Sequence, residues 1–482
     1  MHSKKPGKTV FLANPPYDAI YEKSIIHLFK FVSNNKGDRS LYPPQLGLST
    51  IAPAVVNSGH NVRIFDLNIP SNGQKFAAAL ETEKPDYVGI TFTTPLYNEA
   101  LKILESVKKH SPGSITIGGG PHTSAFPEKT IRLTKFDIVV MGEGDYTLSE
   151  IVNGKPLERI KGIAYKKKGR VFVNPRKEFI HDLDALPFPA WQLFDVNKYN
   201  IPKAVATRNK VGPIETSRGC PWGCVYCTKS VFGRNFRVKS PDRVIEEIKY
   251  MLEQGFEEIH IADDGFTTQI ERAEAICDKI IDSGLKFPWA TITGIRADRV
   301  TLELLKKMKK AGCYRVYYGI ETGNEDIMKR INKGETLEAI TNAVKMSKRA
   351  GLEVYGFFMI GLPGETEETM QQTIDFAKEL RLDMAKISIT SPLPSTPLYE
   401  EYLAKGLIKS DDWSSFNVYS IPENLYDHEN LEWYVIENYY KKFYYSFYLN
   451  PGFMIRRVAH SIRNRTLISD LSVFINFLKK GK

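Results

Sequence analysis

From residue 8 to residue 153, short apolar runs alternate with longer stretches in which apolar residues recur every three or four positions. The short runs predict buried strands, and the longer stretches predict amphipathic helices. Five strands separated by helices predict an α/β fold, with a doubly wound Rossmann-like domain over residues 1–153. A ligand is expected at the carboxyl ends of such strands. The predicted strands cover residues 9–14, 61–66, 86–92, 114–118 and 137–141.

The same alternation resumes further along the chain. Six strand–helix units predict a partial (βα)6 barrel over residues 213–400, with its chemistry at the carboxyl ends of the strands. The intervening residues 154–212 are irregular and rich in Lys and Pro, which predicts a linker with a short hairpin. After Pro392 the alternation stops, and residues 401–482 are predicted to be helical. The predicted barrel strands cover residues 214–217, 258–263, 289–293, 315–320, 353–360 and 384–389.

Composition and charge narrow the class of protein. The 482 residues are 42% hydrophobic and 25% charged, a balance typical of folded globular domains. No apolar run approaches the length of a membrane span and no signal-peptide core is evident, so a cytoplasmic location is expected. The net charge of +10 is concentrated in residues 441–482, which contain nine Lys or Arg and one Asp. The rest of the chain is nearly neutral, and no nucleic-acid partner is expected.

Three of the five cysteines, Cys220, Cys224 and Cys227, fall within eight residues in the segment Arg-Gly-Cys-Pro-Trp-Gly-Cys-Val-Tyr-Cys. The odd number of cysteines argues against a disulfide scaffold. A loop rich in Gly and Pro is a poor core element, but it can wrap thiolates around a soft metal centre. Tetrahedral zinc would need a fourth ligand, and neither Cys277 nor Cys313 has a paired spacing. Three thiolates on an iron–sulfur cubane leave one iron open for a substrate or cofactor.

The spacing Cys-x3-Cys-x2-Cys, with an aromatic residue before the last Cys, resembles the cluster loop of the radical S-adenosylmethionine (SAM) enzymes. The resemblance implies a [4Fe–4S] cluster on Cys220, Cys224 and Cys227, whose unique iron binds the amino and carboxylate groups of SAM. It also implies that an electron from the cluster cleaves SAM to a 5′-deoxyadenosyl radical. A ferredoxin or flavodoxin is the expected electron donor.

Further segments of the barrel half are similar to elements of the same family. They are Gly319-Ile-Glu-Thr-Gly323, Ala262-Asp-Asp-Gly-Phe-Thr267, Met359-Ile-Gly-Leu-Pro-Gly-Glu-Thr366 and Ser391-Pro-Leu-Pro-Ser-Thr-Pro-Leu398. Three alternatives stay open: a plain strand-end carboxylate at Glu321, a capped helix start at Asp263 and Asp264, and a surface ion pair at Arg296. The SAM-binding residues that the resemblance implies are Glu321, Asp264, Arg296, Gly361, Pro363 and Ser388.

The N-terminal half resembles the cobalamin-binding domain that precedes the barrel in the cobalamin-dependent radical SAM class. The matching segments are Asn14-Pro-Pro16, Tyr42-Pro-Pro-Gln-Leu-Gly47, Gly118-Gly-Gly-Pro-His-Thr123 and Met141-Gly-Glu-Gly-Asp145. Bare backbone amides of a tripled glycine suit a large polar tail, and the resemblance implies that this turn lines the dimethylbenzimidazole tail. The alternative is a domain that has kept the fold and lost the cofactor. The implied cobalamin-binding residues are Asn14, Pro44, Gly119, Gly120, His122, Gly142 and Glu143.

His122 is also a candidate cobalt ligand. Cobalamin enzymes that ligate cobalt through His use an Asp-x-His-x-x-Gly motif, and no Asp-x-His occurs in this chain. We therefore interpret His122 as a polar pocket residue and expect a cobalt without a His ligand.

The C-terminal region combines aromatic and basic residues. Ten aromatic residues lie between Tyr426 and Tyr448, and residues 459–478 have apolar residues at roughly helical spacing beside Arg463 and Arg465. Three interpretations stay open: a cap over the barrel mouth that shapes an apolar substrate pocket, a peripheral membrane contact through residues 441–482, and a helical bundle packed on the barrel.

Together, the resemblances predict a cobalamin-dependent radical SAM enzyme that methylates an unactivated carbon of a hydrophobic or lipid substrate. One alternative is C–C bond formation, cyclisation or ring rearrangement on a lipid or tetrapyrrole by the same architecture. Another is a non-catalytic sensor of SAM or cobalamin. Methylation needs no side-chain acid or base, and no catalytic side chain is assigned.

Overall fold

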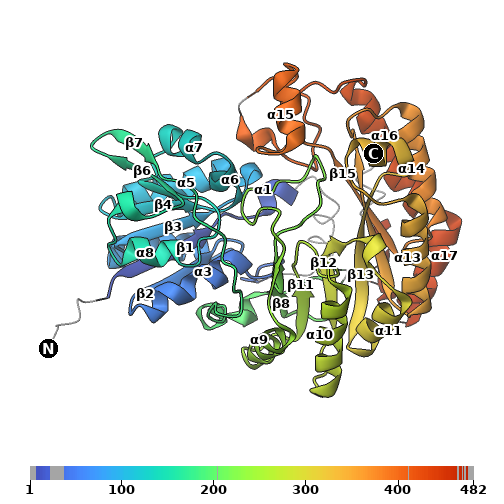
Figure 1. Ribbon diagram of the computed structural model, residues 1–482, viewed down its shortest axis with the longest axis horizontal. Coiled ribbons are helices and arrows are strands. Elements are labelled where there is room, and N and C mark those ends of the chain that lie inside the picture. Colours follow the sequence, from blue (N-terminus) through green and yellow to red (C-terminus); the bar gives the residue numbers. More distant parts are fainter. Residues whose placement is uncertain are drawn as a thin grey trace.

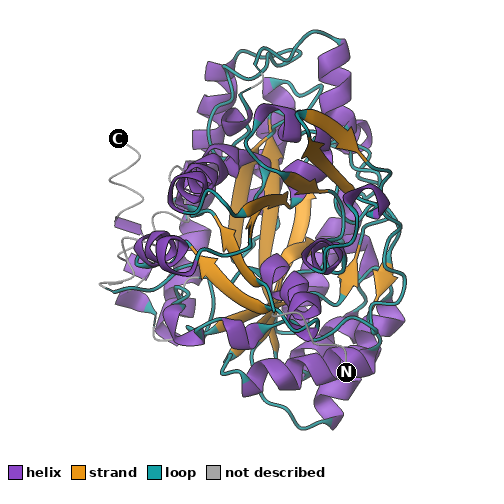
Figure 2. Cartoon of the chain, turned by 90° about the vertical axis from the view of Figure 1, so that its left-hand side faces the viewer, coloured by secondary structure: helices purple, strands orange, loops and turns teal. Residues whose placement is uncertain are grey.

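Two mainly parallel sheets, each flanked by helices, lie side by side in the computed structural model, the first on the left and the second on the right of Figure 1. Seen after a quarter turn, the strands lie at the centre with helices around them (Figure 2). The structure describes residues 7–21, 37–203, 205–410, 412–463, 466–468, 470–471 and 474–475.

The first sheet has seven strands in the order β2-β1-β3-β4-β5-β6-β7, and its first five strands by position are parallel. Alternate residues of β1 point to opposite faces, so that Val10 and Leu12 pack toward α3 and α8, whereas Phe11 and Ala13 pack toward α4 and α5. This confirms the doubly wound α/β fold. The strands are β1 (Thr9–Asn14), β2 (Asn61–Asp66), β3 (Tyr87–Thr91), β4 (Ile115–Gly119), β5 (Ile138–Val140), β6 (Ile163–Lys167) and β7 (Arg170–Val173).

The helices of this half are mostly short and connect successive strands. They are α1 (Asp18–Tyr21), α3 (Leu46–Asn57), α4 (Asn72–Glu83), α5 (Tyr97–His110), α6 (Pro121–Ala125), α7 (Pro127–Leu133) and α8 (Thr147–Val152), with 3-10 turns η1 (Thr94–Leu96) and η2 (Leu157–Arg159).

The segment expected to be a linker, residues 154–212, is largely packed against the first half. Its hairpin forms β6 and β7, which extend the sheet antiparallel to β5. Trp191, in η3 (Trp191–Leu193), is completely buried and stacks edge-on against Phe256 of the barrel half. The 3-10 turn η4 (Val196–Lys198) follows. The short hairpin predicted for this segment is therefore present, and its apolar residues Ile163 and Tyr165 are core residues of the first half.

The second sheet has six parallel strands in the order β15-β14-β13-β12-β11-β8, and its two edge strands do not pair with each other. This is the predicted partial barrel. Ser240, Thr301, Thr336 and Thr366 each cap the helix that follows by accepting a backbone N–H. The strands are β8 (Val211–Ile214), β11 (Glu258–Ile261), β12 (Trp289–Ile295), β13 (Cys313–Glu321), β14 (Glu353–Ile360) and β15 (Met384–Ile389), and the helices are α9 (Pro241–Glu253), α10 (Ile270–Asp282), α11 (Leu302–Lys310), α12 (Glu325–Arg330), α13 (Leu337–Arg349) and α14 (Glu367–Glu379), with 3-10 turn η5 (Ala297–Arg299).

The first barrel strand ends earlier than predicted. Residues 214–217 were expected to form it, but β8 ends at Ile214 because Asp263 binds the next residues. Asp263 accepts hydrogen bonds from the Thr216 backbone N–H (2.5 Å) and from the Ser217 hydroxyl (2.8 Å). The chain then forms β9 (Ser217–Arg218), which pairs antiparallel with β10 (Arg237–Val238).

The C-terminal region is helical, with α15 (Pro397–Ala404), η6 (Trp413–Ser415), α16 (Trp433–Tyr448) and α17 (Pro451–Arg463). The aromatic face of α16 packs on β14 and β15, where Tyr444 donates to the Ile387 carbonyl (3.1 Å) and Tyr448 to the Ala385 carbonyl (2.7 Å). Trp433, Phe443, Tyr444 and Phe447 are therefore core residues, as in the third interpretation, whereas Tyr434 is exposed. The predicted amphipathic stretch 459–478 falls partly outside the described residues. Among the helices within the described ranges, none has the length and hydropathy to cross a bilayer.

Candidate functional site

The cysteine loop runs between β9 and β10 at the carboxyl end of the barrel strands. It begins at Gly219, whose positive φ of 82° and close approach to the Asn235 carbonyl exclude a side chain. Cys220 is buried, whereas Cys224 and Cys227 are partly exposed, and none of the three forms a disulfide. The loop is fastened to the barrel by the Val225 backbone N–H, which donates to the Ile331 carbonyl (3.0 Å).

Two lysines lie close to the thiols. The Lys229 ammonium is 3.5 Å from Cys227 Sγ, and Lys333 interacts electrostatically with Cys224. Burial raises the pKa of Cys224 and of Cys227, and the neighbouring lysine opposes this shift in each case. Within the described residues, no three His, Cys, Asp or Glu side chains converge on a single ion. A cubane binds each cysteine through a different iron, so it does not require such convergence.

Glu321, a predicted SAM-binding residue, ends β13 beside the cysteine loop. It has a positive φ of 68°, which is rare for a residue with a side chain. Its carboxylate accepts a hydrogen bond from Lys333 (3.2 Å), whose ammonium also lies 3.4 Å from Glu335. Burial alone would lower the pKa of Lys333, but Glu321 and Glu335 outweigh it and hold that pKa above its ordinary value. The site therefore holds the Glu321 carboxylate, bonded to the Lys333 ammonium, in a constrained orientation next to the thiols.

Arg296 and Asp264 contact the same loop. The Arg296 guanidinium lies 3.9 Å from the ring centre of Trp222, which is inside the cysteine loop. Its nitrogens donate to Asp298 and to the carbonyls of Lys333 and Gly334. Arg296 is thus largely buried, and its bonds to the barrel and its contact with Trp222 hold the cysteine loop in place. Asp264 accepts a hydrogen bond from the Gly219 backbone and interacts with Lys229.

The remaining predicted SAM-binding residues lie at the ends of β14 and β15. Gly361 has a positive φ of 71°, and a side chain there would touch Ile436 of α16. Pro363 is buried in the same turn, next to Gly361. Ser388 is on the partly exposed face of β15, opposite the buried Ala385 and Ile387, which face α16.

A cavity of about 280 Å³ lies at the carboxyl ends of β1, β3, β4 and β5. Four of the predicted cobalamin-binding residues, Gly119, Gly120, Gly142 and Glu143, line it. No atom lies within 4 Å of the place where a Gly119 side chain would begin, whereas a side chain on Gly120 would meet the Phe92 carbonyl at 2.7 Å. The other walls are mostly apolar, formed by Leu12, Leu46, Leu48, Ile51, Ile90, Ile117, Val140 and Leu148.

Asn14 and Pro44 do not line this cavity. Asn14 is buried at the end of β1 and donates to Asp66 (2.9 Å), which also accepts from the Tyr199 hydroxyl (2.9 Å). Pro44 is buried just before Gln45, which does line the cavity.

His122 lies in an aromatic cluster outside the cavity. Its ring contacts Phe92, Tyr97, Phe126 and Trp413, with a centroid distance of 4.4 Å to Trp413. Burial, with a smaller contribution from the Lys129 charge, lowers the pKa of His122 to about 3. The side chain is therefore neutral and packed, and it is not among the residues that line this cavity.

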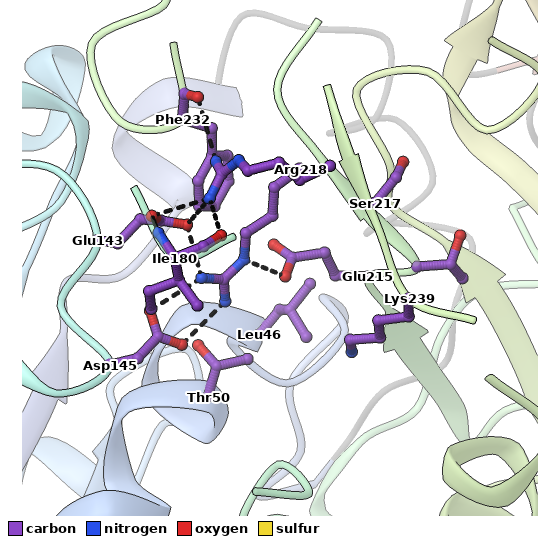
Figure 3. Close-up of polar contacts among 12 residues, drawn as sticks. Leu46, Thr50, Glu143, Asp145, Ile180, Glu215, Ser217, Arg218, Phe232 and Lys239 are labelled. Atoms are coloured by element: carbon purple, nitrogen blue, oxygen red, sulfur yellow. Dashed lines mark hydrogen bonds and ion pairs between the residues drawn. The ribbon is translucent and has the colours of Figure 1, made fainter. Parts of the chain in front are cut away.

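Sequence reasoning missed a buried ion network that lies on the cavity wall. Arg218 of β9 binds Glu143, Asp145 and Glu215, and Figure 3 shows the guanidinium at the centre of these carboxylates. The barrel half lines the cavity through Glu215, Arg218, Val231, Phe232 and Ala262. The sequence features that could have indicated this network are Arg218, two positions before Cys220, and Asp145, the second acid of Gly-Glu-Gly-Asp.

Comparison with known families matches both halves. The family model described as the radical SAM superfamily matches residues 214–377, and the B12 binding domain model matches residues 37–152. The cysteine loop and the glycine-lined cavity fall inside these two matches. Soft thiolate donors suit an iron–sulfur cluster, and an apolar cavity with bare glycine backbone suits a nucleotide tail, so the residues present fit the cofactors of both families.

Three curated relatives share much of the chain. A protein named uncharacterized methyltransferase PH0819, from Pyrococcus horikoshii, is 36% identical over 86% of this chain and 90% of its own length. Cytidylyl-2-hydroxyethylphosphonate methyltransferase from Streptomyces wedmorensis is 29% identical over 78% of this chain and 80% of its own length. Anaerobic magnesium-protoporphyrin IX monomethyl ester cyclase from Rubrivivax gelatinosus is 29% identical over 67% of this chain and 59% of its own length.

Two solved structures share the fold. The radical SAM methyltransferase TsrM from Kitasatospora setae, with cobalamin and a [4Fe–4S] cluster bound, has a TM-score of 0.66 at 17% identity, covering 83% of this chain and 75% of TsrM. The cobalamin-dependent radical SAM enzyme OxsB, with aqua-cobalamin and SAM bound, has a TM-score of 0.72 at 16% identity, covering 97% and 72%. The cofactors implied by the two domains are a [4Fe–4S] cluster, SAM and cobalamin. The chain belongs to the cobalamin-dependent radical SAM methyltransferase family.

Proposed function

We propose that this protein methylates an unactivated carbon of a hydrophobic substrate by radical chemistry. When bound, the cluster and SAM supply the radical, and cobalamin carries the methyl group. The residues proposed to hold them are Cys220, Cys224 and Cys227 for the cluster, Glu321, Gly361 and Ser388 for SAM, and Gly119, Gly120 and Gly142 for the cobalamin tail. The protein's own contribution is to position these groups and exclude water from the reacting carbon.

The observation that carries this proposal is that both halves line one cavity. Gly119 ends β4 and Gly142 follows β5 of the first sheet, whereas Val231 and Phe232 belong to the cysteine loop. Groups held by the loop and by the cavity would therefore meet at the same interface. A sensor that only bound SAM or only bound cobalamin would not need that arrangement.

The interior of the barrel supports a hydrophobic substrate. Tyr317, Tyr355 and Phe357 form an aromatic cluster there, with ring centroids 4.9 and 5.3 Å apart. A relative named hopanoid C-2 methylase, from Rhodopseudomonas palustris, is 26% identical over 79% of this chain, and its name points to a lipid. The phosphonate methyltransferase named above has a polar substrate by its name, so the test must compare both classes.

The first experiment is anaerobic reconstitution with iron, sulfide and cobalamin, with a flavodoxin or a chemical reductant as electron donor. We expect iron, a cobalamin absorption spectrum and 5′-deoxyadenosine formation from SAM. A triple variant, C220A/C224A/C227A, should lose iron and 5′-deoxyadenosine but keep cobalamin. The double variant C277A/C313A is the matched control, because these two buried cysteines lie outside the loop. Iron retained by the triple variant would contradict the cluster assignment.

The second experiment identifies the reaction. The protein is incubated with SAM carrying a deuterated methyl group and, separately, with the organic-soluble and water-soluble metabolite fractions of its source cell. Label in an organic-soluble product, with S-adenosylhomocysteine and 5′-deoxyadenosine both formed, supports methylation of a hydrophobic substrate. Label only in the aqueous fraction contradicts the substrate class. A new product without label, formed with 5′-deoxyadenosine alone, favours cyclisation, the reaction named for one relative.

We also propose a peripheral contact with an anionic membrane surface through α17. Met454, Ile455, Val458 and Ile462 are exposed and form one stripe along this helix, beside the exposed Arg456. The chain from residue 441 onward has a net charge of +8, which complements an anionic lipid surface.

The membrane contact is tested by substitution, because deleting residues from 441 onward would remove core residues of α16 such as Phe443 and Phe447. The variant I455S/V458S/I462S should lose flotation with phosphatidylglycerol vesicles. Y434S is the matched control, since Tyr434 is 67% exposed on α16 and lies outside the stripe. Wild-type protein that does not float with these vesicles, or a triple variant that still floats, would overturn the proposal.

A further inference from the structure

Arg218 links the cysteine loop to the cobalamin-binding half. It lies in β9, two residues before Cys220, and its side chain reaches into the other half of the molecule (Figure 3). Nη1 donates to Glu143 (2.9 Å) and Asp145 (3.0 Å), Nη2 donates to Asp145 (2.9 Å), and Nε donates to Glu215 (2.6 Å). The side chain is only 2% exposed. All three nitrogens are therefore used in a fixed geometry.

The residues that bind Arg218 also form the wall of the cavity. Gly142, Glu143, Gly144 and Asp145 are one turn after β5, and all four line the cavity. The same turn therefore faces the proposed cobalamin tail and holds the strand that leads into the cysteine loop. Displacement of either group would be transmitted to the other through the Arg218 side chain.

A second arginine strengthens this link. Arg237 is in β10, the partner strand of β9, and its Nη1 lies 2.8 and 2.9 Å from the two carboxylate oxygens of Glu143. Arg237 also donates to the Ile180 and Phe232 carbonyls. The ribbon of β9 and β10 thus holds Glu143 from two sides.

Buried ion pairs of this kind add orientation more than stability. Removing charges from water costs free energy that the pairing only partly offsets, so a buried pair is weak support for a stabilising role. A planar guanidinium with two parallel bonds to one carboxylate does restrict direction and distance, and a lysine ammonium cannot reproduce that fork. The geometry at Arg218 therefore suits positioning.

We propose that Arg218 is a positioning residue that holds the cysteine loop and the cobalamin-binding half in one relative orientation. The two cofactors of the family would then be presented to the substrate at a defined separation. This inference rests on the presence of both cofactors and goes beyond the proposed reaction, since it concerns their mutual placement.

The test is the magnetic interaction between the two cofactors in the holoenzyme. A reduced [4Fe–4S] cluster and cob(II)alamin each have an unpaired electron, and their dipolar coupling depends on distance and orientation. We expect a resolved splitting of the cob(II)alamin electron paramagnetic resonance spectrum in the wild type. R218K should retain iron and cobalamin but lose the resolved splitting. A lysine ammonium cannot reproduce the bonds of Arg218 to both Glu143 and Asp145 of the cobalamin-binding half.

R315K is the matched control. Arg315 is also buried and ion-paired, with Glu353, but it lies near the start of β13, far along that strand from Glu321. Its splitting should equal that of the wild type. If R218K does not retain both cofactors, D145N is measured in its place, because it keeps the side-chain shape and removes the charge.

The outcomes separate this inference from the cofactor assignment. An unchanged splitting in R218K, or in D145N where it is used, overturns the positioning role alone. A splitting lost equally in R315K also overturns it, because the effect would then reflect general weakening of the fold. Wild-type protein that takes up no cobalamin overturns both the inference and the cofactor assignment.

Discussion

Two of the contacts that join the first half of the molecule to the rest differ in kind. At one, Arg218 is buried among Glu143, Asp145 and Glu215. At the other, Trp413 of the C-terminal region packs against His122 and Phe126, with ring centroids 4.4 and 5.6 Å apart. The first contact consists of directional, charge-assisted hydrogen bonds. The second is apolar and largely indifferent to small rotations of the rings.

The difference indicates that one contact mainly stabilises the assembly of the two halves and the other mainly fixes their relative orientation. Burial of aromatic surface at Trp413 contributes free energy with little directional demand. The charges at Arg218 are costly to bury, and their favourable interactions depend on distances of about 3 Å being maintained. We therefore expect the Trp413 contact to stabilise the assembly and the Arg218 contact to set its geometry. The predictions below test that division.

The largest effect is expected from R218M, which removes the charge and leaves three buried carboxylates without their shared partner. The free energy of unfolding should fall by about 3–5 kcal/mol, measured from the midpoint of urea denaturation. R63M is the control: Arg63 pairs with Glu83 at the surface, and its loss should cost about 0–1 kcal/mol. A similar small cost for R218M would show that the network is dispensable for folding.

Replacement of Trp413 should come next. W413A removes a ring that is 3% exposed and leaves a space between the C-terminal region and His122. We expect a loss of about 3 kcal/mol by urea denaturation. Y434A, at an exposed position of α16, should change the free energy by no more than about 0.5 kcal/mol. A changed cofactor splitting in W413A would contradict the division proposed above, because this contact is not expected to set the geometry.

The pH dependence of stability should include a contribution from His122. Because burial lowers its pKa to about 3, the unfolded chain binds a proton below pH 6.5 that the folded protein does not. Stability from this group is therefore unaffected above pH 6.5 and falls as the pH drops from 6.5 toward 3. At pH 5 the loss should be about 2 kcal/mol relative to pH 7.5.

H122Q removes this titration, so its urea midpoint should fall less between pH 7.5 and pH 5 than that of the wild type. H181Q is the control, because His181 is exposed, and it should keep the wild-type dependence. An identical pH dependence in H122Q and the wild type would show that His122 is protonated in the folded state as readily as in the unfolded chain.

The smallest effect is expected from K129A. The Lys129 ammonium lies 5.1 Å from the ring centre of Trp413, a cation–π contact worth about 0.5–1 kcal/mol. The urea midpoint of K129A should therefore shift slightly downward, and the shift should vanish in a W413A background. K135A, at an exposed position nearby in sequence, should not shift it. If K129A lowers the urea midpoint equally in the W413A background, the stabilisation by Lys129 comes from another contact.

Much of the fold follows from local pattern. The bounds predicted for β1, β2, β14 and β15 are those of the structure, because each has apolar residues in a run or at alternate positions, with clear ends. A short hairpin was predicted within residues 154–212, but its pairing with β5 was not, because a strand's partner in a sheet is not encoded by its own pattern. The aromatic residues of α16 allowed three interpretations, since a core face and an interaction surface have the same composition.

The sequence by itself determined the cysteine loop, the two successions of strands and helices, and the glycine turns, because these depend on residues within a few positions of one another. Only the tertiary structure decided what surrounds them. Arg218 and Glu143 are 75 residues apart in the chain, and the cavity is lined by residues from Leu12 to Ala262. The sequence predicted His122 as a polar pocket residue. In the structure it lies in an aromatic cluster, where Trp413, almost 300 residues later in the chain, packs against it. Such contacts arise when whole halves of the chain dock, and no local pattern encodes their partners.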